Sequence, residues 1–334
     1  MSIFFKTLLI TLFLLVGSKQ SFANNSDFKL WLSDFTVIAK QSGVTDKTIN
    51  TVLKKSKYLP DVIKYDRFQP EFYENTRTYI KKRTSRLKVK KGVSLYKSQK
   101  KIINKVEKNF GVEKELLLSL MGIETNFGNY LGKMDIISSL ATLSFDKRRS
   151  DFFTEELITI LKLIDSNKID ASILFGSWAG AFGNFQFMPS TIKRYALDYD
   201  KNSIIELKKI DDSFASAANY INKIGWSNEE PCFYKIDLKD NIPNKYLNTS
   251  AKKLINKKSV SYFKKYIKGN NLENINEELI TAIITPDKDI DPKANNLSPA
   301  YLVFNNYELI LKWNRSLRFA LAVCTLKNKF KNEI

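Results

Sequence analysis

Residues 116–128 read LLLSLMGIETNFG, a segment with helical spacing that is apolar on most sides and carries one carboxylate near its end. A helix that is apolar all round is typical of the buried centre of a domain. Glu124 lies three and seven residues after Met121 and Leu117, so helical geometry stacks it on an apolar face. A carboxylate there loses hydration, and we expect its pKa to be raised, as a general acid requires. A buried Glu paired with Arg or Lys would give the same pattern.

Residues 176–190 form a second unusual segment, GSWAGAFGNFQFMPS. Three of the twelve glycines of the chain fall within eight residues here, and missing side chains allow a ligand to approach the backbone closely. Aromatic and amide side chains alternate between them, which suits a sugar. The alternative is a tight structural turn before a helix that begins near Pro189.

The remaining sequence predicts a mainly α protein with a minor β part, without a clean linker. Residues 24–230 read as helical, with helices expected at 26–58, 70–87, 100–109, 113–124, 151–165 and 211–223. Residues 231–300 hold five of the eight prolines and several short β-like runs, which predicts a small mixed lobe. Residues 301–334 return to apolar helix, interrupted at 313–316.

The composition of the 334-residue chain excludes several kinds of catalysis. Because the chain has no His, it cannot form a Ser–His–Asp triad, a Cys–His pair or a His-ligated metal site. Its two cysteines, Cys232 and Cys324, are too few for a zinc cluster and too far apart for a CxxC pair. Acid and base chemistry therefore falls on carboxylates, Tyr or Lys.

The N-terminus, MSIFFKTLLITLFLLVGSKQSFA, has the organisation of a signal peptide over residues 1–23. The apolar run is short for a membrane span, although an uncleaved anchor is the alternative. No Cys lies near the cleavage point, so we expect a periplasmic protein rather than a lipoprotein. Export would permit a Cys232–Cys324 disulfide, the alternative being two buried thiols.

The net charge of +19 indicates an anionic partner. Residues 75–106 contain twelve Lys or Arg and no Asp or Glu. For an exported chain this favours an envelope polymer over nucleic acid, although a solvated helix surface would look the same.

Several motifs together resemble one family. They are GIETNFG at 122–128, SSLATLSFDKRRSDFF at 138–153, GSWAGAFGNFQFMPS at 176–190 and ASAANYINKIGW at 215–226, with DRFQPEF at 66–72 and WNRS at 313–316. In this order and spacing they resemble the membrane-bound lytic murein transglycosylase B family, glycoside hydrolase family 103 with an SLT domain of type 2. The resemblance implies one catalytic domain over residues 24–334. It also implies a lysozyme-like helical core with an α lobe and a small β-containing lobe.

The resemblance also implies an activity. The family cuts the MurNAc–GlcNAc β-1,4 bond of peptidoglycan without water and leaves a 1,6-anhydro-MurNAc end. One Glu acts first as acid and then as base, and by position this is Glu124. The alternatives are a muramidase, in which water attacks, and a non-catalytic peptidoglycan-binding scaffold.

Further site residues are implied by matching positions. Ser177 and Gln186 match polar groups of the cleft near the acid, and Tyr79 and Tyr220 match aromatic groups beside the sugars. Arg148 and Arg149 match basic residues that can meet peptide carboxylates. Asn314 matches a cleft amide, next to Trp313, which stands where some members have Tyr. Core packing or surface charge is the alternative explanation for each.

No cofactor is expected. Some family members carry a calcium loop, and the matching segment here is Asp198–Lys209. Ser203 replaces the glycine of the sixth position and Lys209 the carboxylate of the twelfth, so calcium binding is not expected. The expected partner is the peptidoglycan glycan strand. We expect a monomer with no nucleic-acid partner and no stable membrane anchor.

Overall fold

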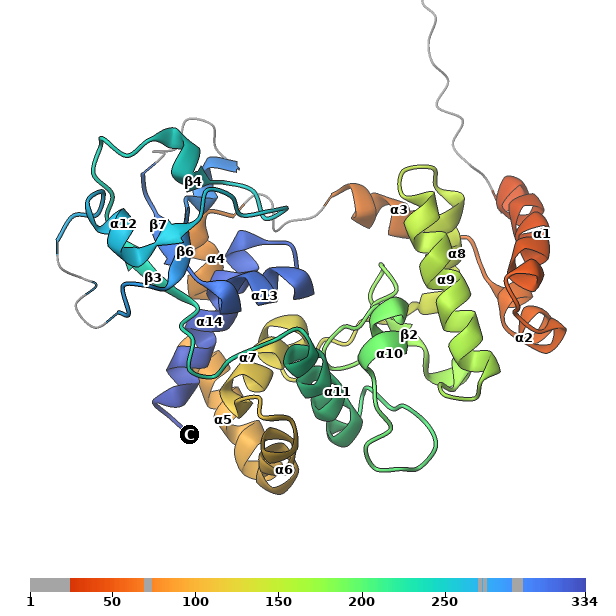
Figure 1. Cartoon of the computed structure of the whole chain (residues 1–334). Helices are drawn as coiled ribbons and strands as arrows, with labels where there is room; N and C mark the ends of the chain where they lie inside the picture. The colour runs from red at the N-terminus through yellow and green to blue at the C-terminus, as the bar shows by residue number, and fades with distance from the viewer. Residues whose placement is uncertain (1–24, 69–73, 270–271, 273–274, 290–296) are drawn as a thin grey trace, which may run out of the picture.

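The computed structural model describes residues 25–68, 74–269, 272, 275–289 and 297–334. The predicted signal peptide lies outside these residues. Figure 1 shows a group of helices around α7, a second helical group at the side of α1, and a small β lobe beside α4 and α13. The predicted mainly α fold with a small β lobe is confirmed.

Helix α7 (Lys114–Thr125) forms the centre of the core, and its side chains from Glu115 to Gly122 are all buried. It packs against α14 (Leu317–Lys331), α5 (Arg86–Ser98) and α6 (Lys100–Phe110). Helix α6 ends at Gly111, whose φ of 66° supplies the left-handed cap that a glycine adopts most easily. The predicted pair of helices around Gly111 is therefore confirmed.

The second helical group forms an α lobe. It consists of α1 (Asn25–Gln41), α2 (Asp46–Thr51), α3 (Pro60–Arg67), α8 (Ile136–Phe145) and α9 (Ser150–Asp165). Helices α8 and α9 pack on each other, and α1 and α3 pack on α8 (Figure 1). The helix expected at 26–58 is divided into α1, α2 and the 3-10 turn η1 (Leu53–Lys55), because Gly43 turns the chain with a φ of 90°.

The helix expected at 70–87 is also shorter than predicted. Residues 69–73 lie outside the described part, and α4 (Thr76–Arg83) ends before Thr84. Ser85 then caps the next helix by accepting from the Lys88 backbone N–H. Helix α11 (Ile210–Lys223) and helix α10 (Pro189–Tyr195) begin close to the predicted residues, and Pro189 occupies the first turn of α10.

The β lobe contains a sheet in the order β3-β7-β6-β4, with β5 (Lys258–Ser259) beside β6. The four strands are β3 (Phe233–Ile236), β7 (Ala300–Val303), β6 (Ile280–Ile284) and β4 (Leu247–Asn248). The short helix α12 (Val260–Lys264) packs on the lobe, which has its own apolar core. The lobe was predicted, but its C-terminal boundary was predicted wrongly. Residues 301–303, which were assigned to the following helix, belong to β7, and α13 (Asn305–Trp313) starts after it.

Two further short strands lie within the helical part of the chain. β1 (Met134–Asp135) pairs antiparallel with β2 (Phe175–Gly176). A disulfide joins Cys232, before β3, to Cys324 on α14, with the two Cα atoms 6.2 Å apart, which is one of the two states that the sequence left open. Among the described residues, no helix is both long and apolar enough to cross a bilayer.

Candidate active site

Glu124 lies half-buried in the last turn of α7, where the chain reverses sharply. Asn126, Phe127 and Gly128 have φ values of 51°, 61° and 80°, three successive left-handed residues. The buried Thr125 hydroxyl accepts from the Gly128 N–H at 3.0 Å and donates to the Asn184 carbonyl at 2.8 Å. The two motifs that stand out in the sequence are thus bonded to each other directly.

The glycine-rich motif forms a tight loop against the segment that follows α7. The Ser177 N–H donates to the Ala181 carbonyl at 2.9 Å, and the Ser177 hydroxyl accepts from the Ala181 N–H at 3.0 Å. A Cβ atom on Gly176 would lie 2.2 Å from the Ala181 carbonyl oxygen, and one on Gly183 would lie 2.5 Å from the Leu207 carbonyl oxygen, so both positions require glycine. The glycines of this motif therefore have the structural role that the sequence left open.

Gln186 connects the same two segments. Its amide nitrogen donates to the Gly183 carbonyl at 3.0 Å and to the Leu131 carbonyl at 3.3 Å. Its side chain is half-buried, and its φ of 51° places it in a left-handed turn. Gln186 and Ser177 therefore lie in one loop that is fastened to the end of the Glu124 helix.

Trp313, at the end of α13, contacts Glu124 directly. The indole Nε1–H donates to Glu124 Oε1 at 2.9 Å. Tyr220 of α11 stacks on the indole with a centroid separation of 5.0 Å, and Tyr195 of α10 stacks on Tyr220 at 4.2 Å. The Tyr220 hydroxyl donates to the Lys312 carbonyl at 3.1 Å, and burial raises the pKa of Tyr220 to about 12. Tyr220 thus supports Trp313 in addition to any contact with a ligand.

Asn314 follows Trp313 and is half-buried. Its backbone N–H caps α13 by donating to the Ile310 carbonyl at 3.0 Å. Within the part of the chain that the structure describes, its side-chain amide has no hydrogen-bond partner. This amide, beside the Trp313–Glu124 contact, is available to a ligand.

Tyr79 is placed differently from the expectation for a sugar-stacking residue. It is only 4% exposed, and the Arg83 guanidinium lies 3.5 Å from its ring centroid. Arg83 is held there by Glu74 at 2.7 Å. At least one face of the Tyr79 ring is therefore covered by a cation rather than open to a sugar.

Arg148 and Arg149 both bind Asp66 of α3. Arg148 Nε donates to Asp66 Oδ2 at 2.7 Å, and its Nη2 donates to the Asp66 carbonyl at 2.6 Å. Arg149 donates to the other carboxylate oxygen, and the Asp66 side chain is 1% exposed. The two arginines, 45% and 39% exposed, fasten α3 to the turn between α8 and α9. No described contact joins them to Glu124.

The sequence did not predict a role for Lys88 of α5. Its ammonium donates to the Gly122 carbonyl of α7 at 2.7 Å, two residues before Glu124. Burial lowers the pKa of Lys88 to about 8, and the nearby Arg83 and Lys91 contribute in the same direction. The sequence of residues 75–106, with its many Lys and Arg, does not indicate which lysine side chain is buried against α7.

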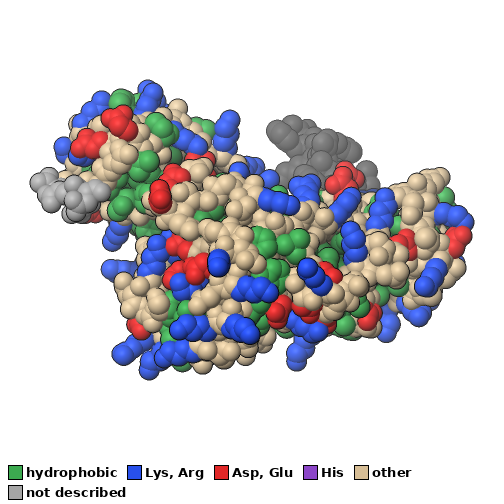
Figure 2. Space-filling view, turned by 60° about the horizontal axis from the view of Figure 1, so that its bottom comes forward, with side chains coloured by type: hydrophobic (Ala, Val, Ile, Leu, Met, Phe, Trp, Pro, Cys, Tyr) green, Lys and Arg blue, Asp and Glu red, His purple; other side chains and the backbone are tan. Residues whose placement is uncertain are grey.

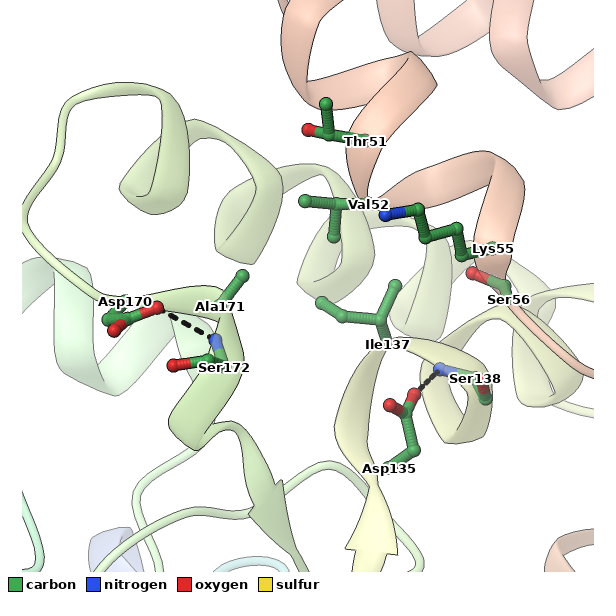
Figure 3. Close-up of a pocket in the computed structure, with 10 residues that line it drawn as sticks. All are labelled: Thr51, Val52, Lys55, Ser56, Asp135, Ile137, Ser138, Asp170, Ala171 and Ser172. Carbon is green, nitrogen blue, oxygen red and sulfur yellow. Dashed lines mark hydrogen bonds between the residues drawn. The ribbon is translucent and has the colours of Figure 1, made fainter.

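A pocket of about 440 Å³ lies in the α lobe and contains two other carboxylates. Figure 3 shows Asp135 and Asp170 on opposite sides of it, accepting from the backbone N–H groups of Ser138 at 2.6 Å and Ser172 at 2.8 Å. The bond to Ser172 lowers the pKa of Asp170, which is unfavourable for an acid. Both carboxylates act as caps, so this pocket does not offer a carboxylate pair for glycosidase chemistry.

The segment Asp198–Lys209, which matches the calcium loop of some family members, brings Asp198 and Asp200 close to Asp212 at the start of α11, with carboxylate oxygens within 4.8 Å. Asp212 Oδ1 and Oδ2 accept from the backbone N–H groups of Tyr199 and Glu206 at 2.7 and 2.8 Å. Lys209 donates to Glu206 at 2.5 Å. Its positive ammonium group stands at the twelfth position, where a calcium loop has a carboxylate. Lys209 thus departs from the twelve-residue calcium-loop pattern, while the three carboxylates lie close enough together to hold an ion.

The mainly helical fold and the single glutamate at the end of a buried core helix define a lysozyme-like class of glycan-cleaving enzymes. Residues 27–328 match the family model described as Transglycosylase SLT domain, and the chain belongs to this family. The predicted family membership is confirmed.

Individual relatives agree with this assignment. Membrane-bound lytic murein transglycosylase B of Escherichia coli (strain K12) is 38% identical over 149 residues, which cover 44% of this chain and 41% of that protein. SltB3 from Pseudomonas aeruginosa, solved with NAG-anhNAM-pentapeptide, superposes with a TM-score of 0.80 at 29% identity, covering 91% of this chain and 79% of that one. The Escherichia coli lytic transglycosylase Slt35, solved with calcium, gives 0.73 at 25% identity, covering 94% and 95%.

Proposed function

We propose that this protein is a lytic transglycosylase that cleaves the MurNAc–GlcNAc β-1,4 bond of peptidoglycan and forms 1,6-anhydro-MurNAc ends. The observation that carries the proposal is Glu124 at the end of α7, held by Trp313 and joined through Thr125 to the loop of Ser177 and Gln186. The family membership and the relative solved with an anhydro-sugar peptide support it.

Glu124 acts twice in the proposed reaction. Its protonated carboxyl donates to the glycosidic oxygen, so the C–O bond breaks and the GlcNAc side leaves as an alcohol. The MurNAc N-acetyl group stabilises the positive anomeric carbon. The Glu124 carboxylate then accepts the proton of the MurNAc 6-hydroxyl as that oxygen closes on the anomeric carbon. Glu124 ends protonated, and no second carboxylate is needed.

The loop of Ser177 and Gln186, together with Asn314, binds the sugar in this proposal. The Asn314 amide offers a donor and an acceptor, and the Ser177 hydroxyl retains its own proton for donation. Holding the 6-hydroxyl near the anomeric carbon supplies effective molarity, and excluding water favours ring closure over hydrolysis. Arg148 and Arg149 remain proposed contacts for stem-peptide carboxylates through their exposed surfaces.

The proposed site of action is the periplasm, with residues 1–23 removed as a signal peptide. The partner is the glycan strand. Figure 2 shows Lys and Arg side chains spread over one face of the molecule, with fewer Asp and Glu side chains among them. Such a surface attracts an anionic polymer.

The test is mass analysis of the muropeptides that residues 24–334 release from purified sacculi, beside the Glu124→Gln variant. We expect anhydro products, one water lighter than reducing-end products, from the unaltered protein only. Reducing-end products would make it a muramidase that uses the same Glu124. Retained sacculus binding without release by either protein would make it a scaffold.

A further inference from the structure

In the hydrogen bond between Trp313 and Glu124, the indole can only donate and the carboxyl oxygen must accept. An indole N–H is a donor without an acceptor lone pair, and it does not titrate in the range where carboxyl groups do. The Nε1–H lies 2.9 Å from Glu124 Oε1, so Oε1 must act as an acceptor in this bond. A protonated Oε1 would direct its hydrogen toward other partners and weaken the contact.

We infer that Trp313 is a positioning residue that keeps Oε1 as a permanent acceptor and assigns the transferable proton to Oε2. The inference rests on the proposed function and deepens it. Oε2 then performs both transfers: it gives its proton to the glycosidic oxygen and takes the proton of the 6-hydroxyl. Oε1 stays bonded to the indole throughout, so the carboxyl group does not rotate between the two steps.

The surroundings of Trp313 fix the indole in this orientation. Tyr220 stacks on it with an interplanar angle of 15°, and Tyr195 continues the stack with an angle of 12°. Phe187 meets the indole edge-on at 5.4 Å. Because Tyr220 is itself bonded to the Lys312 carbonyl, the stack is anchored to the end of α13. A donor held this way needs no rearrangement when charge develops on Glu124.

The chain offers a matched control in Trp226. Its indole N–H is buried and has no hydrogen-bond partner within the described structure, while its ring packs near the Lys327 ammonium at 5.2 Å. Trp226→Phe and Trp313→Phe both replace an indole by a phenyl ring. Of the two, Trp313→Phe is the one that removes a hydrogen-bond donor from a carboxylate. Both retain an aromatic ring for packing.

The kinetic test measures kcat and KM on sacculi fragments for the two variants, with their thermal unfolding midpoints. We expect Trp313→Phe to lower kcat roughly tenfold to a hundredfold with little change in KM, as the loss of a hydrogen bond to a charged group implies. Trp226→Phe should leave kcat near that of the unaltered protein. Unchanged kcat in Trp313→Phe would overturn the inference, as would an equal loss of kcat in both variants.

A second measurement does not depend on turnover. In an ¹H–¹⁵N spectrum the Trp313 indole signal is identified by its absence from Trp313→Phe or Trp313→Tyr. A bond to a carboxylate moves this proton downfield, so we expect an upfield shift in Glu124→Leu and a smaller one in Glu124→Gln. An unmoved signal would overturn the inference even if anhydro products form. Reducing-end products with a moved signal would instead overturn the proposed function and leave the contact established.

Discussion

The hydroxyl of Thr125 lies 2.8 Å from the backbone carbonyl of Asn184 and donates to it, although 59 residues separate the two along the chain. Both residues are almost completely buried. The bond links the end of the Glu124 helix to the loop that carries Ser177 and Gln186. This buried hydroxyl therefore helps, together with the bond from Gln186 to the Leu131 carbonyl, to place the acid relative to the polar groups expected to bind the sugar.

Replacing Thr125 by Val keeps the side-chain shape but removes this hydroxyl. The Asn184 carbonyl and the Gly128 N–H then each lose a buried partner. We expect the free energy of unfolding to fall by about 1–3 kcal/mol and kcat to fall with it. Urea unfolding and muropeptide release measure the two effects.

Ser119→Ala is the matched control for this change. Ser119 is also buried on α7, but among the described residues its hydroxyl donates to the Glu115 carbonyl of the same helix alone, at 2.7 Å. We expect little change in kcat. If Thr125→Val and Ser119→Ala had the same activity, the link between the two motifs would not position the acid.

The buried ammonium of Lys88 predicts a pH dependence of stability. Its pKa is lowered to about 8 in the folded chain from 10.5 in the unfolded one, so the unfolded state binds more protons between these values. The cost of burying the charge is present below about pH 8 and is relieved as the pH rises toward the unfolded pKa. We expect the stability of the unaltered protein relative to Lys88→Met to increase from pH 7 to pH 10.

Parallel urea titrations of both proteins at the two pH values check this, because other titrating groups cancel in the difference. Part of Lys88 is solvated, so the change will be smaller than the full shift implies. A difference that stayed constant with pH would mean that the ammonium keeps its ordinary pKa.

Asp66→Asn tests the contact between α3 and the two arginines. The buried carboxylate accepts from Arg148 and Arg149, so its neutral replacement loses charged hydrogen bonds. We expect a loss of about 2–3 kcal/mol in unfolding free energy. Asp61→Asn on the same helix, which removes an exposed pair with Lys64, should cost less than about 1 kcal/mol. Equal losses would argue against a structural role for the arginines.

The segment Asp198–Lys209 predicts how the protein responds to calcium. Ser203 already has the left-handed φ, 77°, that the sixth position of a calcium loop requires, so Lys209 is the main obstacle. We expect no change in the unfolding midpoint of the unaltered protein on adding calcium, and a calcium-dependent rise in Lys209→Glu. Lys201→Glu makes the same charge change at a non-ligand position and should not respond. A calcium-dependent rise in the unaltered protein would contradict this expectation.

The central helix could be predicted from the sequence because its signals are local. The apolar pattern of residues 116–123 and the glycine at 111 define α7 and its start, and Pro189 defines the start of α10. Residues 301–303 were assigned to helix wrongly, because a short apolar run fits a buried strand equally well. The two-residue strands β1 and β2 carry no sequence signal at all.

In the candidate site, too, the residues with local sequence signals could be predicted, and those placed by contacts between distant segments could not. Glu124 could be found because its apolar neighbours lie within two turns of one helix. Its partner Trp313 lies 189 residues away, so their bond depends on how α13 packs in the folded chain. The covered face of Tyr79 and the arginines bound to Asp66 likewise depend on contacts between distant segments. Sequence spacing alone does not encode such contacts.

The β lobe enters and leaves the core at one point. The Phe304 N–H donates to the Cys232 carbonyl at 3.0 Å, and the disulfide fixes the same point to α14. The two ends of the lobe therefore meet, but Leu254, Ala282, Ile284 and Tyr301 of the lobe also pack in the main core. These side chains share one apolar core with the glutamate helix, so changes in their size act on the packing around that helix. The side chains of the lobe's own core, such as Phe263 and Leu302, are the ones that can change in size without contact with the residues packed around α7.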